Sequence, residues 1–177
     1  LAWVLAGLLL FRKVLLHFGA VDDEATVWVN GREVGRHRGG YTPFTCDLDG
    51  YAAPGDRIVL TVRARDEHRA VKPRGKQSPK HDNFRCLYTR TTGIWQTVWM
   101  EPVPRAYLRR PRITPDLGNG LFRLEVPLAG RTTSGLKLRA ELSDGRGLVS
   151  RAICDASDFT PRLDLPVPAD RRRLWSP

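Results

Sequence analysis

Apolar and polar residues alternate with a period of two along much of this chain. The alternation is clearest over residues 24–30, 57–65 and 135–142, where most apolar side chains fall on one face. A period of two places successive side chains on opposite faces of a β-strand, so these segments predict half-buried strands. No segment repeats apolar residues at the three- and four-residue spacing of an amphipathic helix. The pattern therefore predicts an all-β fold.

Turn signals separate the predicted strands. Asn30 and Gly31 stand between two strand-like runs, and this pair predicts a type I′ hairpin because both central residues of that turn need positive φ. The second half of the chain has further predicted strands, which span residues 106–113, 121–128, 135–142, 148–154 and 160–167. Strands at this spacing, joined by glycine-, asparagine- and aspartate-rich turns, are typical of a β-sandwich.

The segment 90–104 predicts a strand at the centre of the first sandwich. Large apolar side chains occur on both of its faces, with Trp95 and Trp99 on the same face, so we expect the strand to be covered on both sides. Trp28 and these two tryptophans are then expected to pack in the core rather than to offer exposed stacking surfaces to a ligand. Replacing Trp99 by alanine would cost roughly 3–5 kcal/mol at a fully buried position.

Two prolines mark the predicted domain boundary. Pro102 and Pro104 follow the tryptophan-rich strand, and we expect them to end it because proline cannot donate to a sheet ladder. The strand pattern then restarts. The sequence therefore predicts two domains, 1–103 and 104–177, joined by a short, stiff linker.

Residues 66–92 form a long polar segment without usable periodicity. Loops of this length inside compact domains are usually functional or disordered. Basic residues outnumber acidic ones in and beside it: Arg69, Lys72, Arg74, Lys76, Lys80, Arg85 and Arg90 stand against Asp66, Glu67 and Asp82. This segment is the main candidate for a functional loop.

Two long motifs resemble a known family. The motif TRTTGIWQTVWMEPVP (residues 89–104) and the upstream motif LLHFGAVDDEATVWVNGREVGRHRGGYTPFTCDL (residues 15–48) resemble the N-terminal sugar-binding domain of family 2 glycoside hydrolases. That family contains β-galactosidases, β-glucuronidases and β-mannosidases. The final motif RRRLWSP (residues 171–177) is similar to the segment that closes the family's second domain. Residues 1–13 depart from the family pattern, which suggests a truncated or altered N-terminus.

The resemblance implies a fold and a non-catalytic role. It implies a jelly-roll, galactose-binding-like β-sandwich over 1–103 and an immunoglobulin-like β-sandwich over 104–177. Glycoside hydrolysis needs a pair of carboxyl groups across the scissile bond, and no glutamate here belongs to a segment like those that catalyse the reaction in the family. Those segments lie in a barrel that would follow Pro177. We therefore expect a non-catalytic fragment that supports binding of a β-glycoside and packing of the barrel.

The resemblance also points to substrate-binding residues. In the family, the long loop of the first domain can lean over the sugar pocket, and by position that loop is residues 65–90. The residue types suited to sugar recognition here are Arg74, Lys76, Gln77, Asp82 and Tyr88, which offer hydrogen-bonding groups and an aromatic ring. The alternative is a solvated surface loop, or one that only docks on the barrel.

Composition leaves two other functional classes open. The net charge is +10, from 29 basic and 19 acidic residues, which would suit a polyanion such as nucleic acid. The charges are scattered and arginine-rich, so we interpret them as compositional and expect no nucleic-acid or membrane partner. A free-standing carbohydrate-binding module is the alternative function.

Metal, cofactor and disulfide signals are weak. No histidine has a partner at metal-ligand spacing, and His17, between apolar neighbours, is expected to be a satisfied core histidine. No glycine-rich phosphate loop precedes a helix, so we expect no cofactor. Cys46, Cys86 and Cys154 match neither a zinc site nor a disulfide framework. They predict buried free thiols, which favours the cytoplasm.

Overall fold

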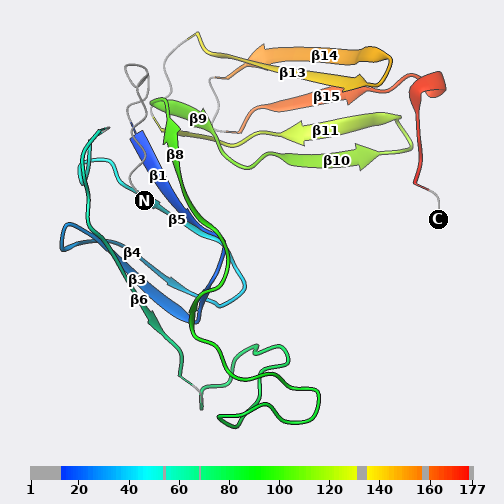
Figure 1. Cartoon of the computed structure of the whole chain (residues 1–177). Helices are drawn as coiled ribbons and strands as arrows, with labels where there is room; N and C mark the ends of the chain where they lie inside the picture. The colour runs from blue at the N-terminus through cyan, green and yellow to red at the C-terminus, as the bar shows by residue number, and fades with distance from the viewer. Residues whose placement is uncertain (1–12, 54, 68, 131–134, 157–159, 176–177) are drawn as a thin grey trace. The chain divides into compact units, whose positions relative to one another are not determined.

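The computed structural model describes residues 13–53, 55–67, 69–130, 135–156 and 160–175. These residues form strands, and their only helix is the short 3₁₀ helix η1 (Ala169–Arg171), so the predicted all-β fold is confirmed. The chain divides into two compact units, unit 1 (Leu1–Pro104) and unit 2 (Arg105–Pro177). Antiparallel sheets make up each unit (Figure 1). The expectation of an altered N-terminus lies almost wholly outside the described residues.

Unit 1 is a β-sandwich of two three-stranded antiparallel sheets, with strand orders β5-β1-β8 and β4-β3-β6, and β2 pairs with β7 beside them. The strands are β1 (Lys13–Phe18), β2 (Val21–Asp22), β3 (Glu24–Val29), β4 (Arg32–Arg38), β5 (Phe44–Asp47), β6 (Leu60–Arg65), β7 (Gly93–Ile94) and β8 (Val98–Val103). The core takes Leu16 and Phe18 from β1, Val27 and Val29 from β3, and Cys46 from β5. Because both sheets contribute to one buried cluster, they pack face to face.

The hairpin between β3 and β4 confirms the turn predicted at Asn30 and Gly31. These residues have φ of 50° and 77°, as a type I′ turn requires. Asn30 also fixes the turn to the start of β6, because its side-chain Oδ1 accepts a 2.9 Å hydrogen bond from the Val59 backbone N–H. The turn sets the register that keeps the apolar side chains of β3 on the core face.

The prediction of one central strand over residues 90–104 is wrong. The segment contains two strands, β7 and β8, and among the described strands β8 pairs with β1 alone, so it is an edge strand of the described sheet. Pro102 does not end β8 but lies within it, opposite Val14. An edge strand tolerates proline where the missing N–H would have pointed away from the neighbouring strand. Within the described sheet, one edge of β8 is therefore hydrogen-bonded to β1, and no described strand pairs with its other edge.

The prediction that the tryptophans of this segment are buried is also wrong. Trp95 and Trp99 are 50% and 45% exposed, whereas Trp28 on β3 is half-buried. Phe18 and its cross-strand partner Val98 contribute to the core, while His17 and its partner Trp99 lie on the opposite face of the same sheet. The apolar pattern on both faces of the segment thus reflects one core face and one exposed aromatic face.

The described residues of unit 2 form seven strands where the sequence predicted five. They are β9 (Ala106–Leu108), β10 (Arg112–Asp116), β11 (Leu121–Glu125), β12 (Leu128–Gly130), β13 (Lys137–Asp144), β14 (Gly147–Asp155) and β15 (Arg162–Pro166). The first two predicted strands are each divided, at Pro111 and at Pro127, where the ladder lacks a donor. The described sheets have strand orders β10-β11-β15, β9-β12 and β13-β14.

The core of unit 2 is small. Its buried members are Val126, Leu138, Ala156 and Leu163, with partly buried apolar side chains from β13 and β14 around them. Alternate residues of β13 and β15 point into this core, as the period-two pattern predicted.

Candidate functional site

The long loop over residues 66–92, between β6 and β7, folds back on itself. It has turns and two isolated bridges, which pair Gln77 with Tyr88 and Phe84 with Leu87. The Ser78 N–H donates to the Tyr88 carbonyl at 2.7 Å, and the Tyr88 N–H donates to the Lys76 carbonyl at 2.9 Å. These backbone bonds give the loop a defined shape, visible beyond the sandwich of unit 1 in Figure 1.

Gln77 connects the loop to the sandwich. Its Nε2 donates a 3.0 Å hydrogen bond to Oδ2 of Asp22 on β2, and its Oε1 accepts a 3.1 Å bond from the Thr91 N–H. Asp22 is buried, so this contact is shielded from competing water. The side chain of Gln77 therefore joins the middle of the loop to β2 and to the end of the loop.

A buried ion cluster makes a second connection. The Lys72 ammonium contacts a carboxylate oxygen of Asp66 and lies 3.4 Å from Oδ2 of Asp23. The three side chains are only 8%, 9% and 11% exposed, in the order Lys72, Asp66 and Asp23. The Thr92 hydroxyl donates to the second oxygen of Asp66 at 3.2 Å. One cation thus neutralises two buried carboxylates where the loop leaves the sandwich.

The ion cluster keeps its members charged. Burial of the Asp66 carboxyl opposes ionisation, but the hydrogen bond and charge of Lys72 outweigh it, so the pKa of Asp66 is lowered. Burial likewise opposes the charge of Lys72, yet the hydrogen bond to Asp66 and the charges of Asp23 and Asp66 raise the pKa of Lys72. The favourable partners thus win over desolvation on both sides of the pair.

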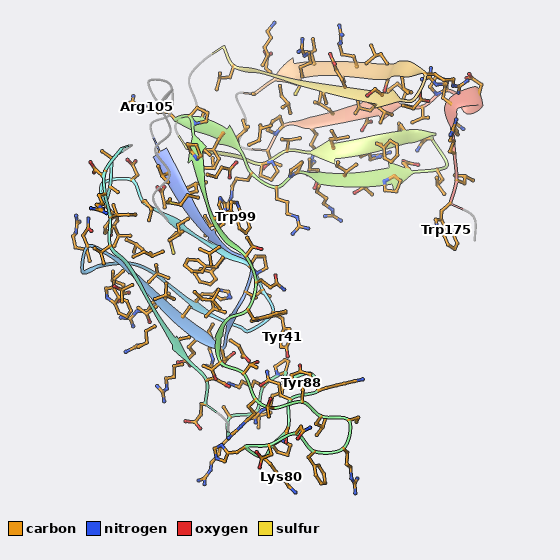
Figure 2. All side chains as sticks on the ribbon, viewed as in Figure 1. Tyr41, Lys80, Tyr88, Trp99, Arg105 and Trp175 are labelled. Atoms are coloured by element: carbon orange, nitrogen blue, oxygen red, sulfur yellow. The ribbon has the colours of Figure 1, made fainter. Side chains whose placement is uncertain are left out.

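Two tyrosine hydroxyls meet the loop at Gly75. A Cβ atom on Gly75 would lie 3.1 Å from the Tyr41 hydroxyl and 3.3 Å from the Tyr88 hydroxyl. Gly75 has a φ of +59°, a conformation that glycine adopts without strain. Burial, followed by the nearby Tyr88 and Asp22, raises the pKa of Tyr41. Figure 2 shows Tyr41 and Tyr88 where the loop meets the sandwich.

The five predicted substrate-binding residues all lie on this loop. Gln77 and Tyr88 are bridge partners. The Arg74 guanidinium donates to the Ala70 carbonyl at 2.8 Å, within the loop. Lys76 and Asp82 are exposed. The structure therefore pairs Gln77 with Tyr88, and the predicted binding set as a whole stays a prediction.

Sequence reasoning missed Asp22, Asp23 and Tyr41. The two aspartates follow Val21 at the end of an apolar stretch, and adjacent carboxylates at such a place are a signal for buried polar contacts. Tyr41 lies in a turn segment between β4 and β5, and nothing in its neighbours indicated that it meets a loop more than thirty residues later in the chain.

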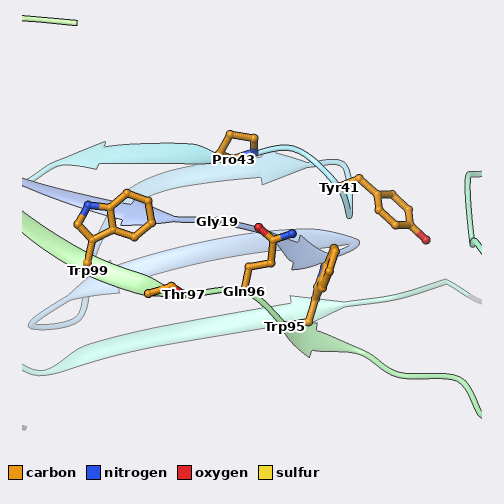
Figure 3. A pocket seen from close by; sticks show the side chains of 7 residues that line it. All are labelled: Gly19, Tyr41, Pro43, Trp95, Gln96, Thr97 and Trp99. Atoms are coloured by element: carbon orange, nitrogen blue, oxygen red, sulfur yellow. The ribbon is translucent and has the colours of Figure 1, made fainter. Parts of the chain in front are cut away.

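A second feature of unit 1 is an open hollow beside the edge strand. Its lining residues are Gly19, Tyr41, Pro43, Trp95, Gln96, Thr97 and Trp99, and its volume is about 610 Å³. We call it the aromatic hollow. Figure 3 shows Trp99 on one side, Trp95 and Tyr41 on the other, and Gln96 between them. Its volume falls within the roughly 300–1,000 Å³ typical of small-molecule sites.

Contacts with neighbouring residues hold the rings of the aromatic hollow in place. The Trp95 indole N–H donates to the Gly40 carbonyl at 2.7 Å, and Tyr41 meets Trp95 edge-on with 5.8 Å between ring centroids. His17 stacks on Trp99 with centroids 4.8 Å apart. The His17 ring contacts Thr45 Oγ1 at 2.9 Å and Glu101 Oε2 at 3.0 Å. His17 is thus a satisfied histidine, as predicted, but it is half-buried on the face opposite the core, so the predicted core position is wrong.

Metal and thiol chemistry have little support in the described part of the chain. No group of three or more potential metal ligands occurs among the described residues. No disulfide is formed, and Cys46 is buried, as predicted. Cys86 is exposed on the loop, so the prediction of buried thiols is wrong there, because the turn that carries Cys86 points away from any core. No described helix is long and apolar enough to cross a membrane.

Comparison with known proteins identifies the family. The profile described as "Glycosyl hydrolases family 2, sugar binding domain" matches residues 7–100. A β-galactosidase of Thermoanaerobacter pseudethanolicus is 28% identical over 173 residues, which cover 94% of this chain and 22% of the relative. A putative β-glucuronidase of Formosa agariphila is 31% identical over 137 residues, which cover 75% of this chain and 15% of the relative.

Solved structures share the fold. The β-glucuronidase of Ruminococcus gnavus superposes with a TM-score of 0.66 at 20% identity, over 98% of this chain and 29% of that one. An FMN-binding β-glucuronidase of Faecalibacterium prausnitzii gives 0.67 at 20% identity, over 93% of this chain and 25% of that one. The chain thus spans less than a third of the length of each of these relatives. The profile covers more than half of the chain, and the chain therefore belongs to glycosyl hydrolase family 2, as a segment that contains the family's sugar binding domain.

Proposed function

We propose that this chain is the non-catalytic, carbohydrate-supporting part of a family 2 glycosidase. In this proposal residues 1–103 form the sugar-binding jelly roll and residues 104–177 form the immunoglobulin-like sandwich. Together they support substrate binding and pack on a catalytic barrel. Family membership and the small share of each relative that the chain spans support the proposal. The relatives' names make β-galactosides and β-glucuronides the substrate classes to test.

The buried carboxylates of unit 1 favour a structural role over catalysis. A glycosidase acid needs a raised pKa, and its partner carboxylate needs access to the sugar. Asp23 and Asp66 are instead neutralised by Lys72, the pKa of Asp66 is lowered, and Asp22 accepts a hydrogen bond from Gln77. Each of these acids is occupied in holding the loop.

The anchoring of the loop by Gln77 is the observation that carries the binding role. Gln77 and the ion cluster fix both the middle and the ends of the loop, so its exposed side is presented in one shape. A preordered surface loses less conformational freedom when a ligand binds. Among the predicted binding residues, Lys76, Asp82 and Tyr88 have exposed side chains.

The binding role is tested on the purified chain by saturation-transfer NMR. Methyl β-galactoside and methyl β-glucuronide are added separately, and Lys76→Ala is compared with Lys137→Ala, a matched change at an exposed lysine of β13. We expect transfer to at least one sugar, and a weaker signal in Lys76→Ala alone. No transfer to either sugar, or equal loss in both variants, contradicts sugar contact by the loop.

The non-catalytic assignment is tested by turnover. We expect no hydrolysis of chromogenic β-galactosides or β-glucuronides by the 177-residue chain. Hydrolysis that persists through further purification and disappears in Asp22→Asn would contradict the assignment and place a catalytic carboxyl in unit 1.

A free-standing carbohydrate-binding module is the second candidate, and the aromatic hollow favours it, because exposed rings beside polar groups suit sugar rings. Such a module would bind sugar in a longer polypeptide no better than alone. We therefore expect the two hypotheses to separate when affinity is compared between this chain and a longer product of the same reading frame.

A further inference from the structure

Trp99 presents one free aromatic face to the aromatic hollow. His17 covers the other face, with a 14° angle between the two ring planes. Thr45 and Glu101 hold His17 by its two ring nitrogens. The indole is therefore a rigid surface that loses little side-chain freedom when a ligand stacks on it. A flat apolar ring fixed in this way suits the C–H face of a sugar ring.

Gln96 supplies an unused hydrogen-bonding group beside that surface. A Cβ atom on Gly19 would lie 2.7 Å from Gln96 Cβ and 2.9 Å from Gln96 Oε1, so the absence of a side chain at Gly19 makes room for Gln96. The described residues offer no hydrogen-bond partner to its carboxamide, which has two donor hydrogens and an acceptor oxygen. Sugar hydroxyls both donate and accept, so they match this group.

The opposite side of the aromatic hollow is also preordered. Trp95 is fixed through its N–H to the Gly40 carbonyl, and Tyr41 packs edge-on against it. Figure 3 shows that these two rings and Trp99 flank Gln96. The hollow thus combines aromatic walls on two sides with an amide between them.

The uncharged lining of the aromatic hollow favours uncharged ligands over charged ones. None of its seven lining residues is charged, although the chain as a whole carries a net charge of +10. A carboxylate placed there would lose hydration without gaining a cation, which is costly. A neutral ligand avoids that penalty.

We infer that the aromatic hollow is a subsite for a neutral pyranose ring, which stacks on Trp99 and hydrogen-bonds to Gln96. The inference rests on the proposed function in that the ligand is a carbohydrate, but its residues differ from those of the loop. It also assigns the ligand's charge, because the hollow favours neutral hexoses over uronic acids.

The test follows the indole N–H signals of the full 177-residue chain by NMR during titration with methyl β-galactoside, methyl β-glucoside and methyl β-glucuronide. Trp99→Phe and Trp95→Phe variants assign the signals. Gln96→Ala and Trp99→Ala are the test variants, and Trp175→Ala, at an 87% exposed tryptophan of unit 2, is the control. Gln77→Ala reports on the loop.

We expect the neutral glycosides to shift the Trp99 signal, with affinity reduced at least about tenfold in Gln96→Ala and Trp99→Ala, the factor that corresponds to 1.4 kcal/mol. Affinity should be unchanged in Trp175→Ala. The glucuronide should bind more weakly than either neutral sugar.

Three results would overturn the inference. These are no shift of Trp99 with any neutral glycoside, tighter binding of the glucuronide, and loss of binding in Gln77→Ala with retention in Gln96→Ala. The last result would leave the proposed function of the loop intact, so failure of the subsite and failure of that function are distinguishable. Because Gln96 is exposed, Gln96→Ala should fold even if Trp99→Ala does not.

Discussion

Replacing Lys72 by methionine should release the long loop from the sandwich. Methionine keeps an unbranched apolar stem but removes the cation that contacts both Asp23 and Asp66. Removing one partner of a buried ion pair costs about 3–5 kcal/mol. That figure is an upper bound here, because the loop can swing away and return both carboxylates to water. We therefore expect a loss of roughly 2–4 kcal/mol at neutral pH, somewhat below that bound.

The pH dependence provides a sharper test of this prediction. In the wild type the folded-state pKa of Asp66 is lowered below its ordinary 3.8, so its stabilisation is present above that value and is lost as pH falls through the folded pKa. The pKa of Lys72 is raised above 10.5, so its stabilisation is present below 10.5 and is lost as pH rises through the folded pKa. In Lys72→Met the burial of the Asp66 carboxyl is no longer opposed by Lys72, although the Thr92 hydrogen bond and the Arg74 charge remain, so the pKa of Asp66 should rise from its wild-type value. The deficit of the variant should therefore shrink as pH falls from 7 toward 4.5.

The assay combines urea unfolding with amide hydrogen exchange. The Ser78 and Tyr88 amides are hydrogen-bonded within the loop and should lose protection in Lys72→Met before the core amides of β1 and β3 do. Lys76→Met, the same change at an exposed lysine of the loop, is the control. A Lys72→Met variant within about 0.5 kcal/mol of the wild type at pH 7, or a deficit that grows at low pH, would refute the reasoning.

Three further changes follow from the geometry. Gly75→Ala should destabilise the loop by about 1–2 kcal/mol, because of its φ of +59° and the two tyrosine hydroxyls beside it, and faster exchange of the Tyr88 amide measures this. Trp99→Ala should cost roughly 1.5–2.5 kcal/mol in urea unfolding, less than the 3–5 kcal/mol of a buried tryptophan, because Trp99 is 45% exposed. Arg171→Gln should return the pKa of Asp144 from about 2, where the Arg171 hydrogen bond holds it, toward roughly 3.9, as an NMR titration would show. Asp144 stabilises unit 2 above its unfolded pKa and loses that effect as pH falls through 2, so the deficit of Arg171→Gln should be largest at neutral pH and should vanish toward pH 2.

Local sequence patterns predicted most of the strands, because the turns and the apolar alternation that define them involve residues close together in the sequence. The turn at Asn30 and Gly31 and the alternation in β3 and β13 depend on neighbours in sequence. The breaks at Pro111 and Pro127 could have been predicted from the missing backbone donor of proline. The predicted strands ran through these positions because the apolar pattern was given more weight than the prolines. Membership of the all-β class followed from the same local signals.

The exposure of Trp95 and Trp99 could not be read from the same pattern. A period-two pattern reports which faces are apolar but not what covers them. Apolar residues on both faces of residues 94–100 were interpreted as burial on both sides, whereas β8 lies at a sheet edge and has the core on one face only. The second face is occupied by His17, stacked on Trp99, and by the open hollow. Whether a strand lies at the edge of a sheet depends on the order of the strands. That order is set by pairing between segments that are far apart in the sequence.

The contacts of Tyr41 show why the sequence alone did not predict the anchoring of the long loop or the aromatic hollow. Its ring lines the aromatic hollow against Trp95, while its hydroxyl lies at Gly75 beside the Tyr88 hydroxyl. One residue thus belongs to both features, although the segments that meet there come from widely separated parts of the chain. None of these segments has a sequence motif that predicts the contacts of Tyr41. The contacts form only when the folded sandwich brings the segments together. The loop is ordered by buried polar contacts, and the hollow is ordered by aromatic stacking. Tyr41 is the residue that the loop contacts and the aromatic hollow have in common.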